Sequence, residues 1–411
     1  MSDVARVGLL GYGTVGSAFA EQLAERAFQV EAISGRRPEL AGVLRRSEGD
    51  FERILADSDV VVELIGGTDP ARGYVLRALE DGKHVITANK QLVAQHGDEL
   101  FAAARAAGVQ LRFEAAVAGV VPVIRVIQES LAATRIEKVF GIVNGTTNFI
   151  LSEMASTGAS YADALARAQE LGYAEADPTE DVGGADAAAK MAILARLAFD
   201  TAVELDDVGY EGITEIQPED IAYAKELGLS LKLLGVAERL GEGISVRVFP
   251  CFINADHPLA PIEGPFNAVM VEAPTITEIT MSGPGAGGPQ TATAVLGDVV
   301  SILAGEAPVH ELRRELAPVS DVGSSFYLHL EVADRPGVLA QIADVLGRNG
   351  ISVQSVLQRG LGDEARLVMV LHESPERAFY AALEEIGRLD FLRSAPRAIR
   401  VIEEELPSPA R

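Results

Sequence analysis

The chain has a single cysteine, Cys251, no tryptophan, and aromatic residues make up only 5% of its 411 positions. One cysteine excludes an internal disulfide and any CxxC metal cluster, which is typical of a protein from a reducing compartment. The chain contains no run of uninterrupted apolar residues long enough to span a membrane, and its start lacks the basic segment and long apolar run of a signal peptide. We therefore expect a cytoplasmic, soluble protein.

Positive charge is also scarce. The chain has 35 Lys and Arg residues and 60 Asp and Glu residues, which gives a formal net charge of −25. A field of this sign repels nucleic-acid phosphates and anionic lipid headgroups. We therefore expect neither a nucleic-acid partner nor a membrane partner. Hydrophobic residues make up 48% of the chain, which at this length predicts two or three domains of ordinary size.

Residues 1–130 alternate short apolar runs with stretches of helical periodicity, the pattern of a Rossmann-type α/β domain with a doubly wound parallel sheet. The expected helices include Pro70–Glu80 and Leu92–Ala107. The expected strands are Arg6–Leu10, Gln29–Ile33, Val60–Ile65, His84–Thr87 and Val109–Ala115.

The mixed pattern of strands and helices over residues 131–304 predicts an α+β substrate-binding and dimerisation domain. Its last helix, over Thr291–Leu303, is expected to pack back on the first domain. Its expected strands are Val139–Val143, Ser230–Arg239, Ile244–Ile253 and Ala268–Glu272. Residues 305–325 are interpreted as a linker. Residues 326–403 have the order βαββαβ of a ferredoxin-like domain, and residues 404–411 are expected to form a frayed tail.

The first motif, GYGTVG, contains Gly11, Gly13 and Gly16 together with Thr14 and Val15. It follows an apolar strand and opens a helix, so its glycines allow a tight turn and a close approach of the backbone to a pyrophosphate. A glycine-rich turn without a ligand is the alternative. The position at the start of a βαβ unit favours a dinucleotide site.

In dinucleotide-binding domains of this type, the residue that contacts the ribose lies about 20 residues further on, at the end of the second strand. There the sequence has Arg36 and Arg37 and no carboxylate. Two guanidinium groups would bind a 2′-phosphate, so we expect NADP rather than NAD, with use of both left open. Two solvated loop arginines are the alternative.

The most informative segment places Asp186 and Lys190 four residues apart, on one face of a helix whose apolar stripe continues through Ile193. A charged pair on a buried face is costly unless it has a function, and a lysine there could transfer a proton. Glu175 and Asp181 lie on the polar loop before this helix and could converge on a cationic substrate.

Other segments leave two interpretations open. Lys90 in TANK follows the fourth strand, where doubly wound sheets bind ligands, but it could be a surface lysine. Glu114 starts a turn whose carbonyl oxygens could hold a hard cation or merely connect two elements. Asn144–Asn148 could contact a ligand or form a turn. Cys251 lies in an apolar strand and is interpreted as a core residue, which argues against covalent aldehyde dehydrogenase chemistry.

With these residues identified, the chain resembles homoserine dehydrogenases that carry a C-terminal ACT domain. The resemblance covers nearly the whole length and depends on GYGTVG, TANK, EAAVAG, GIVNGTTNFIL, LGYAEADP and SGPGAGG, in family order. It implies reversible reduction of L-aspartate 4-semialdehyde to L-homoserine with NAD(P)H, in threonine, methionine and isoleucine biosynthesis.

The resemblance also implies residue roles. Lys190 would be the proton donor, assisted by Lys90 near the nicotinamide. Glu175 and Asp186 would hold the substrate, with Asp181 a further acidic residue in the site. Gly285 and Gly287 would close over the cofactor from the second domain. A monovalent cation, Na⁺ or K⁺, would bind at Glu114 and at main-chain oxygens of Val117, Gly119 and Val121, although Val120 replaces part of the family's glycine run.

The terminal domain resembles ACT modules through DRPGVL, which includes Asp334, Gly337 and Val338. The resemblance implies an amino-acid effector, threonine, at this turn and an assembly into a homodimer or homotetramer. A purely dimerising domain is the alternative. For the whole chain, two other functions stay open: another dehydrogenase with an ACT tail, and a non-catalytic sensor of NADPH and amino acids.

Overall fold

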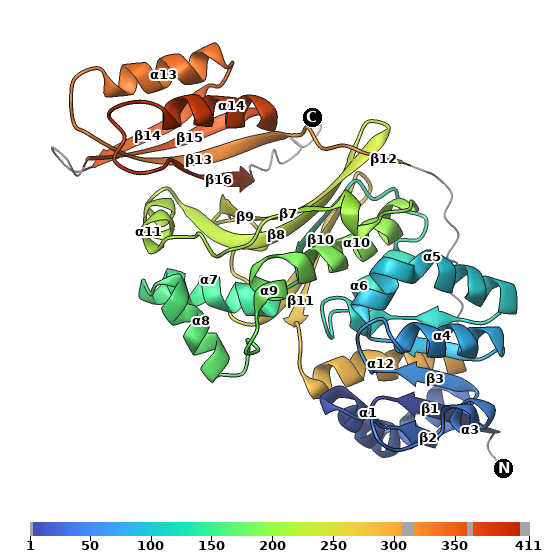
Figure 1. The fold of residues 1–411 in the computed structure, drawn as a ribbon. Helices are drawn as coiled ribbons and strands as arrows, with labels where there is room; N and C mark the ends of the chain where they lie inside the picture. The colour runs from blue at the N-terminus through green and yellow to red at the C-terminus, as the bar shows by residue number, and fades with distance from the viewer. Residues whose placement is uncertain (1–2, 306–315, 360–364, 403–411) are drawn as a thin grey trace.

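The computed structural model describes residues 3–305, 316–359 and 365–402. Its N-terminal domain contains a five-stranded parallel sheet with the order β2-β1-β3-β4-β5 (Figure 1). The strands are β1 Asp3–Leu10, β2 Arg36–Leu44, β3 Val60–Glu63, β4 His84–Thr87 and β5 Leu111–Arg112. The helices between them are α1 Thr14–Glu25, α2 Ala27–Ser34, α3 Phe51–Ala56, α4 Ala71–Glu80 and α5 Lys90–Ala107. The doubly wound parallel sheet is therefore confirmed.

The strand expected over Gln29–Ile33 is wrong, because this segment is helix α2. Ala27 and Val30 are its buried residues, and their i, i+3 spacing is a helical pattern. Gly35 ends the helix in the left-handed conformation, with φ of 75°. The second strand is the next run, Arg36–Leu44, which pairs with β1 in parallel.

A second, larger sheet has the order β11-β10-β6-β8-β9-β16-β13-β15-β14, with two short strands, β7 and β12, beside β9. The strands before the ACT region are β6 Lys138–Ile142, β7 Gly209–Tyr210, β8 Leu229–Leu240, β9 Gly243–Asn254, β10 Phe266–Ala273 and β11 Thr277–Pro284. Strand β11 was not expected, and β12 Ala317–Pro318 lies in the segment interpreted as a linker. The linker residues 306–315 and the tail 404–411 lie outside the described residues.

Helices cover one face of this sheet, and their residues share one hydrophobic core with those of β8 and β9. They are α7 Gly145–Thr157, α8 Tyr161–Glu170, α9 Thr179–Val182, α10 Ala185–Phe199 and α11 Pro218–Glu226. Single-turn elements occur at Glu114–Ala116, Val123–Arg125 (α6), Val126–Ser130 and Leu205–Asp207. Helix α12, Gly288–Leu303, instead packs against α1 and β1, where Val295 and Val299 join the core of Val7 and Leu9.

The terminal domain has the order β13 Gly323–Val332, α13 Val338–Arg348, β14 Val353–Arg359, β15 Ala365–Pro375, α14 Glu376–Gly387 and β16 Arg397–Ile402. The expected βαββαβ arrangement is therefore confirmed, with α13 and α14 on the side away from the rest of the chain (Figure 1). Strand β16 pairs in parallel with β9, and Arg400 lies opposite Cys251. The sheet of the terminal domain thus continues the sheet of the second domain within one chain.

Candidate active site

Asp186 lies at the centre of a cluster of charged side chains between the first and second domains. Its carboxylate accepts a hydrogen bond from Lys190 Nζ at 2.7 Å through Oδ2, and Lys90 Nζ lies 2.5 Å from Oδ1. The side chain of Asp186 is 4% exposed, whereas those of Lys190 and Lys90 are 13% and 33% exposed. The i, i+4 pair on the buried face of α10 is therefore present, and TANK supplies a second lysine from the other domain.

The end of β6 and the start of α7 hold this cluster in place. The carbonyl oxygen of Val143 accepts a hydrogen bond from Lys190 Nζ at 2.7 Å. Asn144 caps α7 by accepting from the Thr147 N–H, and its Nδ2 donates to Asp181 at 2.7 Å and to Asp186 at 2.8 Å. One buried amide therefore caps a helix and orients two carboxylates of the site.

The charges in the cluster shift the pKa values of its members in opposite directions. Burial alone would raise the pKa of Asp186, but the two adjacent lysines outweigh it and hold the pKa far below its usual range. Burial alone would lower the pKa of Lys90, but the charge of Asp186 outweighs it and raises the pKa. Asp186 is therefore an anion and Lys90 a cation at neutral pH.

Glu175 lies on the loop between α8 and α9, and it is exposed. Its carbonyl oxygen accepts a hydrogen bond from Gln169, whereas the carbonyl of Tyr173 accepts from Thr146 at 2.7 Å. Thr146 also donates to Asp181. The loop is thus attached to the start of α7 through Thr146, which also contacts Asp181.

Glu63, which ends β3, was not predicted as a site residue from the sequence. This side chain is fully buried, accepts from the backbone N–H groups of Ile65 and Gly66, and accepts from Thr87 Oγ1 at 2.5 Å. The Thr87 hydroxyl in turn accepts from the N–H of Asn89, which caps α5 immediately before Lys90. A carboxylate at the end of an apolar strand was the signal, because the carboxyl ends of parallel strands meet at the ligand edge of the sheet.

The nucleotide turn has the geometry that its glycines predicted. Gly11 has φ of 100°, and a Cβ there would lie 2.5 Å from the carbonyl oxygen of Leu64. A Cβ on Gly16 would lie 2.2 Å from the carbonyl oxygen of Gly11, so this glycine allows the close contact of helix and strand. A Cβ on Gly13 would meet open space, and Gly13 is the N-cap of α1. The N–H groups of Thr14 and Val15 begin this helix, whose positive end favours an anion.

A loop of the second domain, residues 284–288, faces this turn. A Cβ on Gly288 would lie 3.0 Å from atoms of Thr14, and a Cβ on Gly119 would lie 2.6 Å from the carbonyl oxygen of Gly285. Gly287 has φ of 129° and is the N-cap of α12. The loop with Gly285 and Gly287 therefore lies against the start of α1, on the side where a dinucleotide would bind.

Arg36 and Arg37 do not follow the second strand, as the predicted ribose site required. They begin β2 and therefore lie at the amino-terminal end of the parallel strands. There Arg36 forms ion pairs of 3.1 and 3.2 Å with Asp3 and Asp59. The error follows from the strand that was expected over the residues of α2. The arginines that follow β2 are Arg45 and Arg46, and both are exposed.

Known proteins match this chain over nearly its whole length. The sequence matches the NAD binding domain of homoserine dehydrogenase over residues 11–114, homoserine dehydrogenase over residues 122–300 and the ACT domain over residues 327–391. A homoserine dehydrogenase of Mycobacterium tuberculosis is 43% identical over 427 residues, which cover 96% of this chain and 97% of the relative. The chain belongs to the homoserine dehydrogenase family.

Solved structures agree with this assignment. A homoserine dehydrogenase from Thiobacillus denitrificans has a TM-score of 0.90 and 38% sequence identity, covering 99% of this chain and 100% of the other. A hyperthermophilic archaeal homoserine dehydrogenase in complex with NADPH has a TM-score of 0.63 and 26% identity, covering 75% of this chain and 100% of the other. The predicted family, fold class and class of enzyme, an NAD(P)-dependent oxidoreductase, are confirmed. The roles of single residues stay predictions.

The turn at which the homoserine dehydrogenase resemblance implies a cation begins at Glu114, which is buried. Its carboxylate accepts from the N–H groups of Ile124 and Arg125 at 2.9 and 2.8 Å. Burial, and then the charge of Asp298, raises the pKa of Glu114 to about 7. Among the described residues, no group of three or more His, Cys, Asp or Glu side chains is arranged to hold a metal ion.

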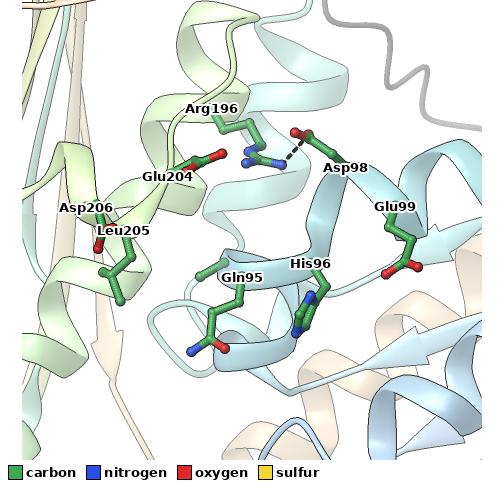
Figure 2. Close-up of a pocket in the computed structure, with 9 residues that line it drawn as sticks. Gln95, His96, Asp98, Glu99, Arg196, Glu204, Leu205 and Asp206 are labelled. Atoms are coloured by element: carbon green, nitrogen blue, oxygen red, sulfur yellow. Dashed lines mark hydrogen bonds and ion pairs between the residues drawn. The ribbon is translucent and has the colours of Figure 1, made fainter.

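Some cavities of the described residues lie outside the cluster at Asp186. The expected effector residues Asp334, Gly337 and Val338 line one of about 750 Å³ between β13 and α13. Another, of about 530 Å³, lies beside α5 and is lined by none of the predicted site residues (Figure 2). There Arg196 of α10 and Asp98 of α5 form an ion pair of 2.6 Å. Helices α5 and α10, which carry the two lysines, are thus joined by an ion pair here as well as at Asp186.

In the described part of the chain, no helix is long and apolar enough to cross a membrane.

Proposed function

We propose that the chain catalyses the reversible, NAD(P)H-dependent reduction of L-aspartate 4-semialdehyde to L-homoserine, in threonine, methionine and isoleucine biosynthesis. The observation that carries the proposal is the buried carboxylate of Asp186 with Lys190 and Lys90 on its two oxygens. Lys90 comes from the first domain and Asp186 and Lys190 from the second, so the cluster joins the two domains. The chain belongs to the homoserine dehydrogenase family.

The residues of the nucleotide turn fit a dinucleotide. The side of Gly13 that a Cβ would occupy is open, and α1 begins there with its backbone N–H groups. Gly285 and Gly287 approach the same turn from the second domain. A bound reduced nicotinamide supplies the hydride. The chain has to orient the aldehyde, limit the access of water and deliver one proton.

Lys190 is proposed to deliver that proton. Its Nζ is held by the carbonyl oxygen of Val143 and by Asp186, so a third direction of the ammonium group is left for the substrate oxygen. Negative charge develops on this oxygen during reduction, and an ammonium group at hydrogen-bond distance stabilises the charge and then transfers the proton. In the oxidation of homoserine, the same amine accepts the proton. Lys90 supplies a second positive charge from the opposite domain.

The acidic side chains are proposed to bind the ammonium group of the substrate. Asp181 is oriented by Asn144 and Thr146, and the exposed carboxylate of Glu175 lies on the loop that Thr146 attaches to α7. Carboxylates bind a primary ammonium group through charge-assisted hydrogen bonds. Asp186 is already engaged by two lysines, so its main role in this proposal is to hold both lysines in position and to keep Lys90 charged.

NADP is the proposed cofactor, and Arg45 and Arg46 now support it in place of Arg36 and Arg37. The carbonyl oxygen of Leu44, the last residue of β2, accepts from the N–H of Gly11 at 2.9 Å. The end of β2 is therefore joined to the nucleotide turn, and the guanidinium of Arg45 lies over the ring of Tyr12 inside that turn. Guanidinium groups at this edge suit a 2′-phosphate.

The monovalent cation also stays a proposal. The turn supplies a carboxylate at Glu114 and backbone carbonyls at Val117, Gly119 and Val121, which are the oxygen ligands that hard cations prefer. Gly119 has φ of 65°, and the turn lies against the carbonyl oxygen of Gly285. A cation here would connect the first domain to the loop that faces the cofactor.

Threonine is the proposed effector, and the cavity at Asp334, Gly337 and Val338 is its proposed site. The cavity has the polar turn and helix start at which an amino acid can be held through its backbone groups. We propose a homodimer or homotetramer as the assembly and the cytoplasm as the location, in keeping with the single buried cysteine.

The deciding experiment measures the oxidation of NADPH with L-aspartate 4-semialdehyde, in the presence and absence of threonine. Turnover that threonine suppresses supports both the active site and the effector site. Turnover that does not respond to threonine supports the active site and contradicts the effector. Binding of NADPH without turnover on the semialdehyde would contradict the proposed reaction and favour a sensor.

A further inference from the structure

Asn267 in β10 is a fully buried polar side chain, and neither atom of its amide has a hydrogen-bond partner among the described residues. A buried donor and acceptor that are both unpaired cost free energy, and most such groups in proteins are satisfied. The neighbouring residues of this strand, from Ala268 to Val271, are buried and apolar. An amide at this position is therefore unfavourable for packing alone.

The amide lies against the loop 284–287, which follows β11, the partner strand of β10. A Cβ on Gly285 would lie 2.2 Å from Asn267 Oδ1 and 2.5 Å from Nδ2, so Asn267 fills the space next to the Gly285 backbone. On the other side, β10 pairs with β6, where Ala268 lies opposite Ile142. The residue that follows β6 is Val143, whose carbonyl oxygen accepts a hydrogen bond from Lys190. Asn267 thus lies between the cofactor loop and the strand end that positions the proton donor.

The loop itself is held by long hydrogen bonds. The N–H of Gly285 donates to the carbonyl of Pro265 at 3.4 Å, and the N–H of Val120 donates to the carbonyl of Pro284 at 3.5 Å. Both distances are at the upper limit for such bonds. A small displacement of the loop backbone could bring its N–H and C=O groups into bonding distance of an amide that has both a donor and an acceptor free.

We propose that Asn267 is a positioning residue that fixes the loop 284–287 over a bound nicotinamide dinucleotide, by hydrogen bonds from its amide to the loop backbone that form when the nucleotide binds. The inference depends on the proposed function, because it requires that this loop closes over the cofactor. The amide is unpaired before binding and paired after it, so part of the binding free energy comes from satisfying Asn267. In the absence of cofactor, loss of the amide therefore does not lower the free energy of unfolding.

The test uses Asn267→Leu, which keeps the branched shape of the side chain and removes both polar atoms. We expect its melting temperature without cofactor to be unchanged or higher, and its dissociation constant for NADPH to rise about tenfold, the loss of roughly one hydrogen bond to a buried partner. The increase in melting temperature on addition of NADPH should shrink accordingly. The control is Ser245→Ala in β9, which removes another buried and unpaired polar atom and should leave NADPH binding unchanged.

Wild-type NADPH affinity in Asn267→Leu would overturn the inference and make Asn267 a packing residue. A wild-type chain that does not bind NADPH would instead overturn the proposed function. Should Asn267→Leu not fold, Gly285→Ala tests the contact from the other side, because its Cβ would collide with the amide. If the amide is needed, the double variant Gly285→Ala, Asn267→Ala stays as weak as Asn267→Ala. If Asn267 is only an obstacle, the double variant regains the affinity of the wild type.

Discussion

Lys190 donates a hydrogen bond to the carboxylate of Asp186 one helical turn earlier, across 2.7 Å, and both side chains lie on the buried face of α10. We expect Lys190→Ala to lower kcat by about 10²–10⁴-fold, the usual contribution of a positioned general acid. The dissociation constant for NADPH should stay close to that of the wild type, because Lys190 lies in the second domain beside Val143. Steady-state turnover and NADPH fluorescence titration give the two values. A kcat close to that of the wild type would remove Lys190 from the mechanism.

Asp186→Asn should change the pH dependence of the reaction as well as its rate. The charge of Asp186 outweighs burial and raises the pKa of Lys90, so a neutral amide lets this pKa fall. Lys90 then loses its proton at a lower pH, and the alkaline limb of the kcat profile should move to lower pH. Glu180→Gln is the matched control, because Glu180 is exposed and contributes less to the same pKa. Identical alkaline limbs in the wild type and Asp186→Asn would contradict this electrostatic role.

Replacement of Arg45 and Arg46 by alanine should lower the preference for NADPH over NADH. Two charge-assisted contacts to a 2′-phosphate are lost, which predicts an increase of the KM for NADPH by about 10–100-fold. The KM for NADH should change little. The control is the double variant Arg36→Ala, Arg37→Ala at the opposite sheet edge, whose ratio of the two KM values should equal that of the wild type. A ratio that shifts only in this control would restore the first interpretation of the sequence.

Asp334→Ala should weaken threonine inhibition without changing turnover in the absence of threonine. Asp334 lines the cavity between β13 and α13, where its carboxylate can accept from the ammonium group of an amino acid. We expect the inhibitory threonine concentration to rise about tenfold or more. Asp344→Ala serves as the control, because Asp344 is an exposed carboxylate of α13 that pairs with Arg348. Equal threonine sensitivity in Asp334→Ala and the wild type would place the effector elsewhere.

Local patterns predicted the parts of this chain that depend on local spacing. The pair Asp186 and Lys190 follows from helical periodicity, and the turn at Gly11 follows from the needs of a strand–helix junction. Glu63 was missed because its role depends on Thr87 in the neighbouring strand, a partner that only the parallel register provides. The pairing of β16 with β9 was missed for a related reason, because backbone groups carry it and side-chain patterns do not specify which strand edges meet.

The junction between the terminal domain and the second domain, where β16 pairs with β9, gives a prediction about stability. Glu376 at the start of α14 accepts hydrogen bonds from Nε and Nη2 of Arg400 at 2.8 and 2.9 Å, and it also accepts from Arg247 of β9. Burial alone would raise the pKa of Glu376, but the hydrogen bond and charge of Arg400 outweigh it and lower the pKa. Glu376→Gln should therefore destabilise the chain by roughly 1–3 kcal/mol at neutral pH, since it removes the carboxylate that two largely buried arginines share. Arg247 keeps its ion pair with Glu238, and Arg400 keeps its ion pair with Glu211.

The pH dependence of that loss has a definite sign. A carboxyl group with a lowered pKa in the folded chain stabilises it above the unfolded pKa, and this contribution disappears as the pH falls through the folded value. The difference in melting temperature between the wild type and Glu376→Gln should thus be largest at pH 7. It should become smaller below the ordinary glutamate pKa of 4.5. Glu384→Gln on the same helix removes an exposed carboxylate and should change little at either pH. A difference that persists unchanged into acid would show that the size of the side chain, and not its charge, joins the ACT domain to β9.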